Sequence, residues 1–133
     1  MSTTQVKAFG TEAKDKDLQE MHIERRDVRP TDIEIDILYC GVCHSDLHTA
    51  RNDWGFTSYP AVPGHEIVGK VAAVGSAVTK YKVGDTVGVG VIIDSCNTCK
   101  HCQADYEQYC VEGATGTYNA MERDGVTVSQ GGY

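Results

Sequence analysis

The stretch Cys96-Asn97-Thr98-Cys99-Lys100-His101-Cys102, followed after seven more residues by Cys110, holds four of the six cysteines of this 133-residue chain. The intervals between these cysteines are typical of Cys-x-x-Cys metal signatures. Zn²⁺ takes four thiolates in a tetrahedron at about 2.3 Å, and a short loop can supply all of them. The spacing therefore predicts a structural zinc in a lobe at residues 94–113. Disulfides are the alternative, but residues 1–7 lack the apolar segment of a secretory signal.

Length and charge limit what the chain can be. Its 133 residues fit one domain, 1–133, and its 19 acidic and 12 basic side chains give a net charge of −7. This charge argues against nucleic acid and against an anionic membrane as partners. No apolar run approaches the roughly 20 residues needed to cross a bilayer. Because zinc thiolates suit a reducing compartment, we predict a cytoplasmic protein.

Short alternating segments and 14 glycines predict a mostly β fold. The clearest strand covers residues 33–37, where apolar and acidic side chains alternate so that one face is buried and the other wet. Two further strands are expected at 67–74 and 85–93, and weaker ones at 6–9 and 18–23. Residues 126–128 suggest another strand or hairpin. One short helix is expected at 45–51, after Cys43.

A second set of metal-competent side chains consists of Cys43, His65 and Glu66. These residues are too far apart in sequence for a loop site, so folding must bring them together. A catalytic zinc takes three protein ligands and leaves a fourth position open, for which a mixed set of donors is suitable. Taken alone, a single cysteine is more often a small buried apolar residue, and a single histidine is more often hydrogen-bonded for structural reasons.

Three segments share a family resemblance. GHEIVG at 64–69, KVGDTV at 82–87 and CGVCHSDLH at 40–48 resemble the zinc signature of the medium-chain alcohol dehydrogenases. The last segment is most similar to the cinnamyl-alcohol dehydrogenase branch, which includes bacterial aldehyde reductases; sorbitol and threonine dehydrogenases fit less well. The resemblance covers essentially the whole chain. It implies a GroES-like partial barrel with a short helix and a structural-zinc loop.

The resemblance also implies roles for single residues. Cys43 and His65 match ligands of the catalytic zinc, and Glu66 matches a glutamate beside the metal that is either a ligand or a neighbour of the ligands. Asp46 matches the aspartate that orients the zinc histidine. Ser45 and His48 match a relay that carries the alcohol proton to solvent, since an imidazole can pass a proton in either direction near neutral pH.

Two further positions match the surroundings of that site. His44 matches a residue near the cofactor's phosphates or ribose, although a solvent-exposed histidine fits the sequence equally well. Trp54 matches a wall of the substrate pocket, and a core or interface aromatic is the alternative. Ser45 and Asp46 could also serve to cap the short helix.

The chain departs from the family in what it lacks. Family members are longer and add a third catalytic-zinc ligand, usually a cysteine, and a Rossmann domain with a Gly-x-Gly-x-x-Gly turn. We expect this chain to be the amino-terminal portion of an enzyme that moves a hydride between a small alcohol or aldehyde and NADP(H), with the cofactor bound by the missing domain. The resemblance is compatible with a homodimer of the complete enzyme. The alternative is a catalytically silent zinc-binding β module, and we expect the isolated chain to be inactive.

Overall fold

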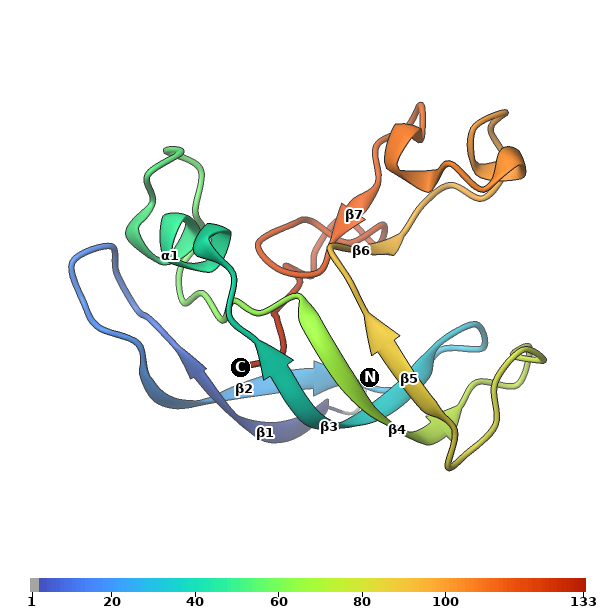
Figure 1. Cartoon of the computed structure of the whole chain (residues 1–133), viewed down its shortest axis with the longest axis horizontal. Helices are drawn as coiled ribbons and strands as arrows, with labels where there is room; N and C mark the ends of the chain where they lie inside the picture. Colours follow the sequence, from blue (N-terminus) through green and yellow to red (C-terminus); the bar gives the residue numbers. More distant parts are fainter. Residues whose placement is uncertain (1–2) are drawn as a thin grey trace.

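The computed structural model describes residues 3–133 and shows a mostly β chain with one α-helix in that range (Figure 1). The helix is α1 (His44–Arg51). The strands are β1 (Thr3–Gly10), β2 (Gln19–Arg26), β3 (Ile33–Gly41), β4 (Glu66–Val74), β5 (Thr86–Val89), β6 (Ile92–Asp94) and β7 (Thr115–Gly116). Two 3₁₀ turns, η1 (Cys102–Ala104) and η2 (Glu107–Tyr109), lie in the loop between β6 and β7.

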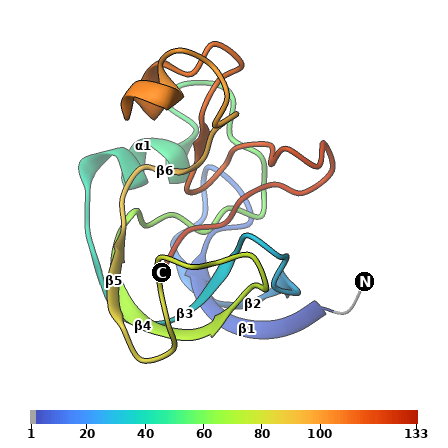
Figure 2. The same ribbon diagram turned by 90° about the vertical axis from the view of Figure 1, so that its right-hand side faces the viewer.

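The strands form three small antiparallel sheets. β1 pairs with β2, β4 lies between β3 and β5, and β6 pairs with β7. β1 to β5 curve around one side of the molecule, while α1 and the loop between β6 and β7 lie at the opposite end (Figure 2). This arrangement confirms the predicted mostly β fold.

Most predicted elements are present, and one is wrong. The segments 33–37 and 67–74 fall within β3 and β4, and α1 begins one residue before the predicted helix. The single strand predicted at 85–93 is instead divided into β5 and β6. The break follows from competing hydrogen bonds, because Thr117 donates its N–H to the Val91 carbonyl at 3.1 Å and its hydroxyl to the Gly90 carbonyl. These bonds draw the chain away from β4 and toward β7.

The alternation predicted for β3 holds only in its first half. Ile33 and Ile35 are half-buried, but Ile37 is 42% exposed. The pairing of β3 with β4 shifts register between Ile37 and Tyr39, and Tyr39 is exposed as well. The shift alters the two-residue period only beyond Ile37. Ile37 itself lies opposite Gly69, which has no side chain to cover it.

The main buried cluster lies between the first hairpin and the chain's last residues. Ala8, Ile23 and Val62 form its centre, with Val6, Met21 and Tyr133 packed against it. The last residue of the chain also contacts β1, because Phe9 donates its N–H to the Tyr133 carbonyl at 3.1 Å. Among the described residues, α1 is far too short and too polar to span a membrane.

An irregular hairpin at residues 121–128 connects to the strands through ion pairs. A bridge joins Met121 to Val128, and Glu122 donates its N–H to the Thr127 carbonyl at 2.8 Å, so residues 126–128 form one arm of a hairpin, as suggested. Arg26 contacts Glu122 at 3.0 Å, and Arg29 contacts Asp124 at 2.6 Å. These contacts fix the carboxyl-terminal segment against β2 and the turn that follows it.

Candidate metal centres

The four cysteines of the loop between β6 and β7 converge on one point. Their Sγ atoms all lie within 4.8 Å of one another, with Cys96 to Cys102 at 3.8 Å and Cys99 to Cys102 at 3.5 Å. In a tetrahedron with zinc–sulfur bonds of about 2.3 Å, the sulfurs are about 3.8 Å apart. All six cysteines of the chain are free thiols. The sulfur geometry therefore fits a four-coordinate zinc, and the chain forms no disulfide.

Backbone donors and one arginine favour thiolates in this loop. The Cys99 N–H donates to Cys96 Sγ at 3.3 Å, and the Cys96 N–H donates to Cys110 Sγ at 3.4 Å. Arg123 Nη2 lies 3.7 Å from Cys110 Sγ. Hydrogen bonds from the Thr98 N–H and hydroxyl lower the pKa of Cys96 to about 6.

One thiol of the loop behaves differently. A hydrogen bond with Ser95 favours the Cys102 thiolate, but burial and contact with Cys99 outweigh it and raise the pKa of Cys102 to about 11. Four adjacent thiolates would repel one another. A divalent cation would remove that repulsion, which is a property expected of a metal-binding set.

The second predicted set also comes together. Donor atoms of Cys43, His65 and Glu66 lie within 4.8 Å of one another. Cys43 is the N-cap of α1, and Glu66 opens β4 opposite Gly41 of β3. A Cβ on Gly41 would lie 2.4 Å from Glu66 Oε2, so a glycine leaves the space that this carboxylate occupies. Thiolate, imidazole and carboxylate together are a donor set that Zn²⁺ accepts.

Asp46 links the two sides of this second set. Its carboxylate is almost fully buried and accepts the Cys43 N–H at 2.9 Å and the Gly64 N–H at 3.2 Å. Its Oδ1 also lies 3.5 Å from His65 Nδ1. Burial alone would raise the pKa of Asp46, but these donors and the Tyr133 hydroxyl keep it below its usual value. Asp46 thus caps α1 and also approaches His65. The helix-capping role and the histidine-orienting role expected for this residue are therefore compatible.

Ser45 does not cap the helix with its side chain. Its hydroxyl donates to Cys43 Sγ at 3.2 Å and lies 3.5 Å from the Tyr118 hydroxyl. The Tyr118 hydroxyl is also 3.1 Å from His65 Nδ1, closer than Asp46, and the two rings stack with centroids 5.4 Å apart. Burial is the main cause that raises the pKa of Tyr118 to about 12, so this hydroxyl keeps its proton at neutral pH.

A cavity of about 200 Å³ opens beside these groups. It is lined by Ser45, His65, Val91, Gly116, Thr117 and Tyr118. His65 is the member of the donor set in its wall, and Gly116, Thr117 and Tyr118 come from the segment around β7. A small polar molecule in this cavity would lie next to the Ser45 hydroxyl and the His65 ring.

The remaining predicted residues form an exposed aromatic ladder on α1 and the loop after it. The His44 and His48 rings stack at 4.8 Å, His48 lies 5.3 Å from Trp54, and Trp54 stacks on Phe56 at 5.9 Å. His48 Nδ1 is 2.7 Å from Asp53 Oδ2. Trp54 is 49% exposed, so in this chain it is not the core aromatic of the alternative interpretation.

Three partners of the site were not predicted from the sequence: Tyr118, Tyr133 and Asp53. Only one carried a usable signal. Tyr133 follows two glycines, and paired glycines often mark a close approach of backbone to another segment. Tyr118 and Asp53 lie in segments whose composition is that of ordinary loops.

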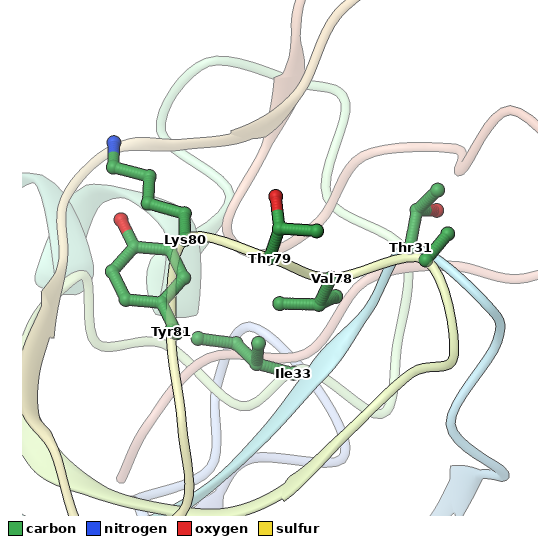
Figure 3. Close-up of a pocket in the computed structure, with 7 residues that line it drawn as sticks. Thr31, Ile33, Val78, Thr79, Lys80 and Tyr81 are labelled. Carbon is green, nitrogen blue, oxygen red and sulfur yellow. The ribbon is translucent and has the colours of Figure 1, made fainter.

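A second cavity, of about 310 Å³, lies away from the metal donors (Figure 3). Lys80 and Tyr81 lie toward one end of it and Thr31 toward the other, with Ile33 and Val78 between them. Its lining contains no cysteine, histidine or carboxylate. Of the two cavities, the smaller one is therefore the one that carries a metal-competent side chain, His65.

Comparison with known proteins agrees with this geometry. Residues 29–133 match the alcohol dehydrogenase GroES-like domain. The chain is 57% identical to probable mannitol dehydrogenase 1 of Stylosanthes humilis over 129 residues, 53% identical to cinnamyl alcohol dehydrogenase 2 of Arabidopsis thaliana over 131, and 52% identical to aldehyde reductase YahK of Escherichia coli over 128. These matches cover 96%, 97% and 96% of this chain.

A solved structure gives the same result. The structure of CAD from Helicobacter pylori complexed with NADP(H) superposes with a TM-score of 0.89 at 40% identity, over 99% of this chain and 38% of that one. The chain spans 36%, 35% and 36% of the three relatives, just over a third of their length. The resemblance noted in the sequence is confirmed: the chain belongs to the alcohol dehydrogenase GroES-like domain family.

Proposed function

We propose that this chain provides the metal-binding part of a zinc-dependent alcohol dehydrogenase or aldehyde reductase that moves a hydride reversibly between a small alcohol or aldehyde and NADP(H). The observation that carries the proposal is the convergence of Cys43, His65 and Glu66 next to the Ser45 hydroxyl, at the edge of a small cavity. The names of the relatives point to the same reaction class.

Separate residues of the chain would bind the metal and orient its ligands. Cys43 Sγ, His65 and Glu66 would hold the catalytic zinc, and the four-cysteine loop would hold a structural one. A zinc ion in the first set would act as a Lewis acid that lowers the pKa of a substrate hydroxyl. Asp46 and Tyr118 orient the His65 ring from its Nδ1 side, which leaves Nε2 as the ligating atom.

Proton transfer is the second task of the chain. Ser45 Oγ is placed to accept a proton from a hydroxyl in the cavity because it lines that cavity, and it would pass its own hydroxyl proton on toward His48. His48 is held by Asp53 through Nδ1, so Nε2 is the nitrogen that can take up and release a proton. His44 stacks on His48 and is proposed to face the cofactor, and Trp54 to border the substrate. NADP(H) would supply the hydride or accept it.

A second candidate function applies to the 133-residue chain by itself. The four-cysteine set offers a complete tetrahedron, whereas the Cys43 set offers three donors. The isolated chain would then be a zinc-binding β module without turnover. Its free thiols support the prediction of a reducing, cytoplasmic location.

The test follows NADPH absorbance with benzaldehyde as substrate. A complete protein that contains this chain should turn over, and Cys43→Ser should lower kcat/KM by about a thousandfold, which corresponds to about 4 kcal/mol of lost transition-state stabilisation. Cys40→Ser is the matched control, because this neighbouring cysteine is outside the donor set. Turnover retained in Cys43→Ser would remove Cys43 from the site. Turnover by the isolated chain would refute the silent-module reading.

A further inference from the structure

The last three residues of the chain lie along the loop that leads into His65. Gly131 donates its N–H to the Val62 carbonyl at 2.7 Å, and Gly132 donates to the Gly64 carbonyl at 3.0 Å. A Cβ on Gly131 would lie 2.2 Å from the Pro63 carbonyl oxygen. The two glycines therefore allow a backbone contact that no larger residue could make, and this contact fixes the position of the residue that follows.

That residue, Tyr133, reaches across the loop to Asp46. Its hydroxyl donates to Asp46 Oδ2 at 2.5 Å and is 3.4 Å from the Gly41 carbonyl. Its ring lies against Gly64, where a Cβ would be 2.6 Å from the ring and where φ is +103°. Gly64 thus leaves room for the ring immediately before His65. Burial, then the adjacent Asp46 carboxylate, raises the pKa of Tyr133, so the hydroxyl remains a donor at neutral pH.

The carboxylate that Tyr133 holds is the shared contact of the second donor set. Oδ2 accepts both the Tyr133 hydroxyl and the Cys43 N–H, while Oδ1 accepts the Gly64 N–H and lies 3.5 Å from His65 Nδ1. Because both oxygens are fixed by donors on opposite sides, the plane of the carboxylate is set. Without the tyrosine hydroxyl, Oδ2 would lose one donor and keep the Cys43 N–H.

We propose that Tyr133 is a positioning residue for the Cys43–His65–Glu66 metal site, acting through Asp46. The hydroxyl fixes the carboxylate, and the carboxylate fixes the backbone at Cys43 and Gly64 and the Nδ1 side of His65. The assignment of a metal to this site rests on the proposed function. The role of Tyr133 toward Asp46 rests on the hydrogen bonds alone.

The experiment compares Tyr133→Phe with Tyr59→Phe in the 133-residue chain. Each variant loses one tyrosine hydroxyl, and the Tyr59 hydroxyl donates to the Ala50 carbonyl at 2.8 Å, away from Asp46. Zn²⁺ affinity is measured by competition with a chromophoric chelator. We expect Tyr133→Phe to weaken the Cys43 site by about 10- to 100-fold, as is usual for partners of metal ligands, and to leave the four-cysteine site within about twofold. Tyr59→Phe should change neither.

A second measurement separates this proposal from the assignment of the metal. Amide hydrogen exchange, with one equivalent of Zn²⁺ added, reports on the Cys43 and Gly64 N–H groups that donate to Asp46. Tyr133→Phe should speed exchange at both amides by about tenfold or more, and Tyr59→Phe should not. A wild-type chain that binds no second zinc would refute the proposed ligand set, and exchange alone would then decide the role of Tyr133.

Two results would overturn the proposal. One is unchanged exchange at Cys43 and Gly64 in Tyr133→Phe. The other is an equal loss of affinity at both zinc sites, because that pattern indicates general destabilisation rather than positioning of one site.

Discussion

Replacing Asp46 with asparagine tests the network around the second donor set most directly. The side chain keeps its size but loses one acceptor oxygen and the negative charge. Each Asp46 oxygen accepts one backbone N–H, from Cys43 on one side and from Gly64 on the other. Asparagine offers one oxygen and one NH₂ group, so either orientation places a donor against a backbone donor.

The magnitude follows from these contacts. One buried N–H without an acceptor costs about 1–3 kcal/mol. The hydrogen bonds that remain change from charge-assisted to neutral, and this loss adds about 1 kcal/mol. The side chain is only 1% exposed, so water cannot replace the missing acceptor. We therefore expect Asp46→Asn to lower the free energy of unfolding by about 3 kcal/mol, or the melting temperature by about 10 °C.

The assay is thermal and urea unfolding of zinc-loaded protein followed by circular dichroism. Asp53→Asn is the matched control, because Asp53 is exposed and its carboxylate contacts the half-buried His48 ring rather than buried backbone N–H groups. The control should change stability by less than about 1 kcal/mol. If Asp46→Asn melted within about 2 °C of the wild type, the claim that Asp46 connects Cys43 to Gly64 would be refuted.

Two other perturbations test the zinc loop and the hairpin at residues 121–128. Cys99→Ser should reduce the zinc bound per chain by one and lower the melting temperature by about 10 °C or more, because binding of a structural zinc contributes to the folding free energy. The control Lys100→Ser should change neither quantity. Native mass spectrometry measures the zinc content, and calorimetry measures the melting temperature. Hydrogen bonds from Thr127, then Val126, and contact with Arg29 lower the pKa of Asp124 from 3.8. Asp124 therefore stabilises the fold above pH 3.8 and loses this effect as the pH falls through its lower folded value. Asp124→Asn should be less stable than the wild type at pH 6, and their melting temperatures should converge toward pH 2; a constant difference would contradict this.

Local sequence signals predicted the elements and the donors. Cysteine spacing was sufficient for the four-sulfur cluster, because its members lie within one loop and the geometry is largely local. Alternation was sufficient for the cores of β3 and β4, because strand periodicity is a local property. The convergence of Cys43 with His65 required the family resemblance, since nothing in either segment alone indicates the other.

The features that the sequence did not predict depend on contacts between distant segments. The break after β5 arises from Thr117, which competes for the carbonyls of Gly90 and Val91. Ile37 is exposed although it shares a face with Ile35, and its partner in β4 is Gly69, which has no side chain to cover it. In both cases the local propensity is that of a strand, and a partner far along the chain decides the outcome.

Asp46 shows why a single carboxylate can matter to both folding and the proposed chemistry. Its donors come from three separate segments: the start of α1, the loop before β4 and the last residue of the chain. A neutral acceptor with one oxygen could serve two of them at most without placing a donor against a donor, whereas a carboxylate serves all three and still approaches His65. The docking of the carboxyl-terminal segment and the geometry of the Cys43 and His65 donors are therefore not independent. Folding of that segment completes the surroundings of the metal site.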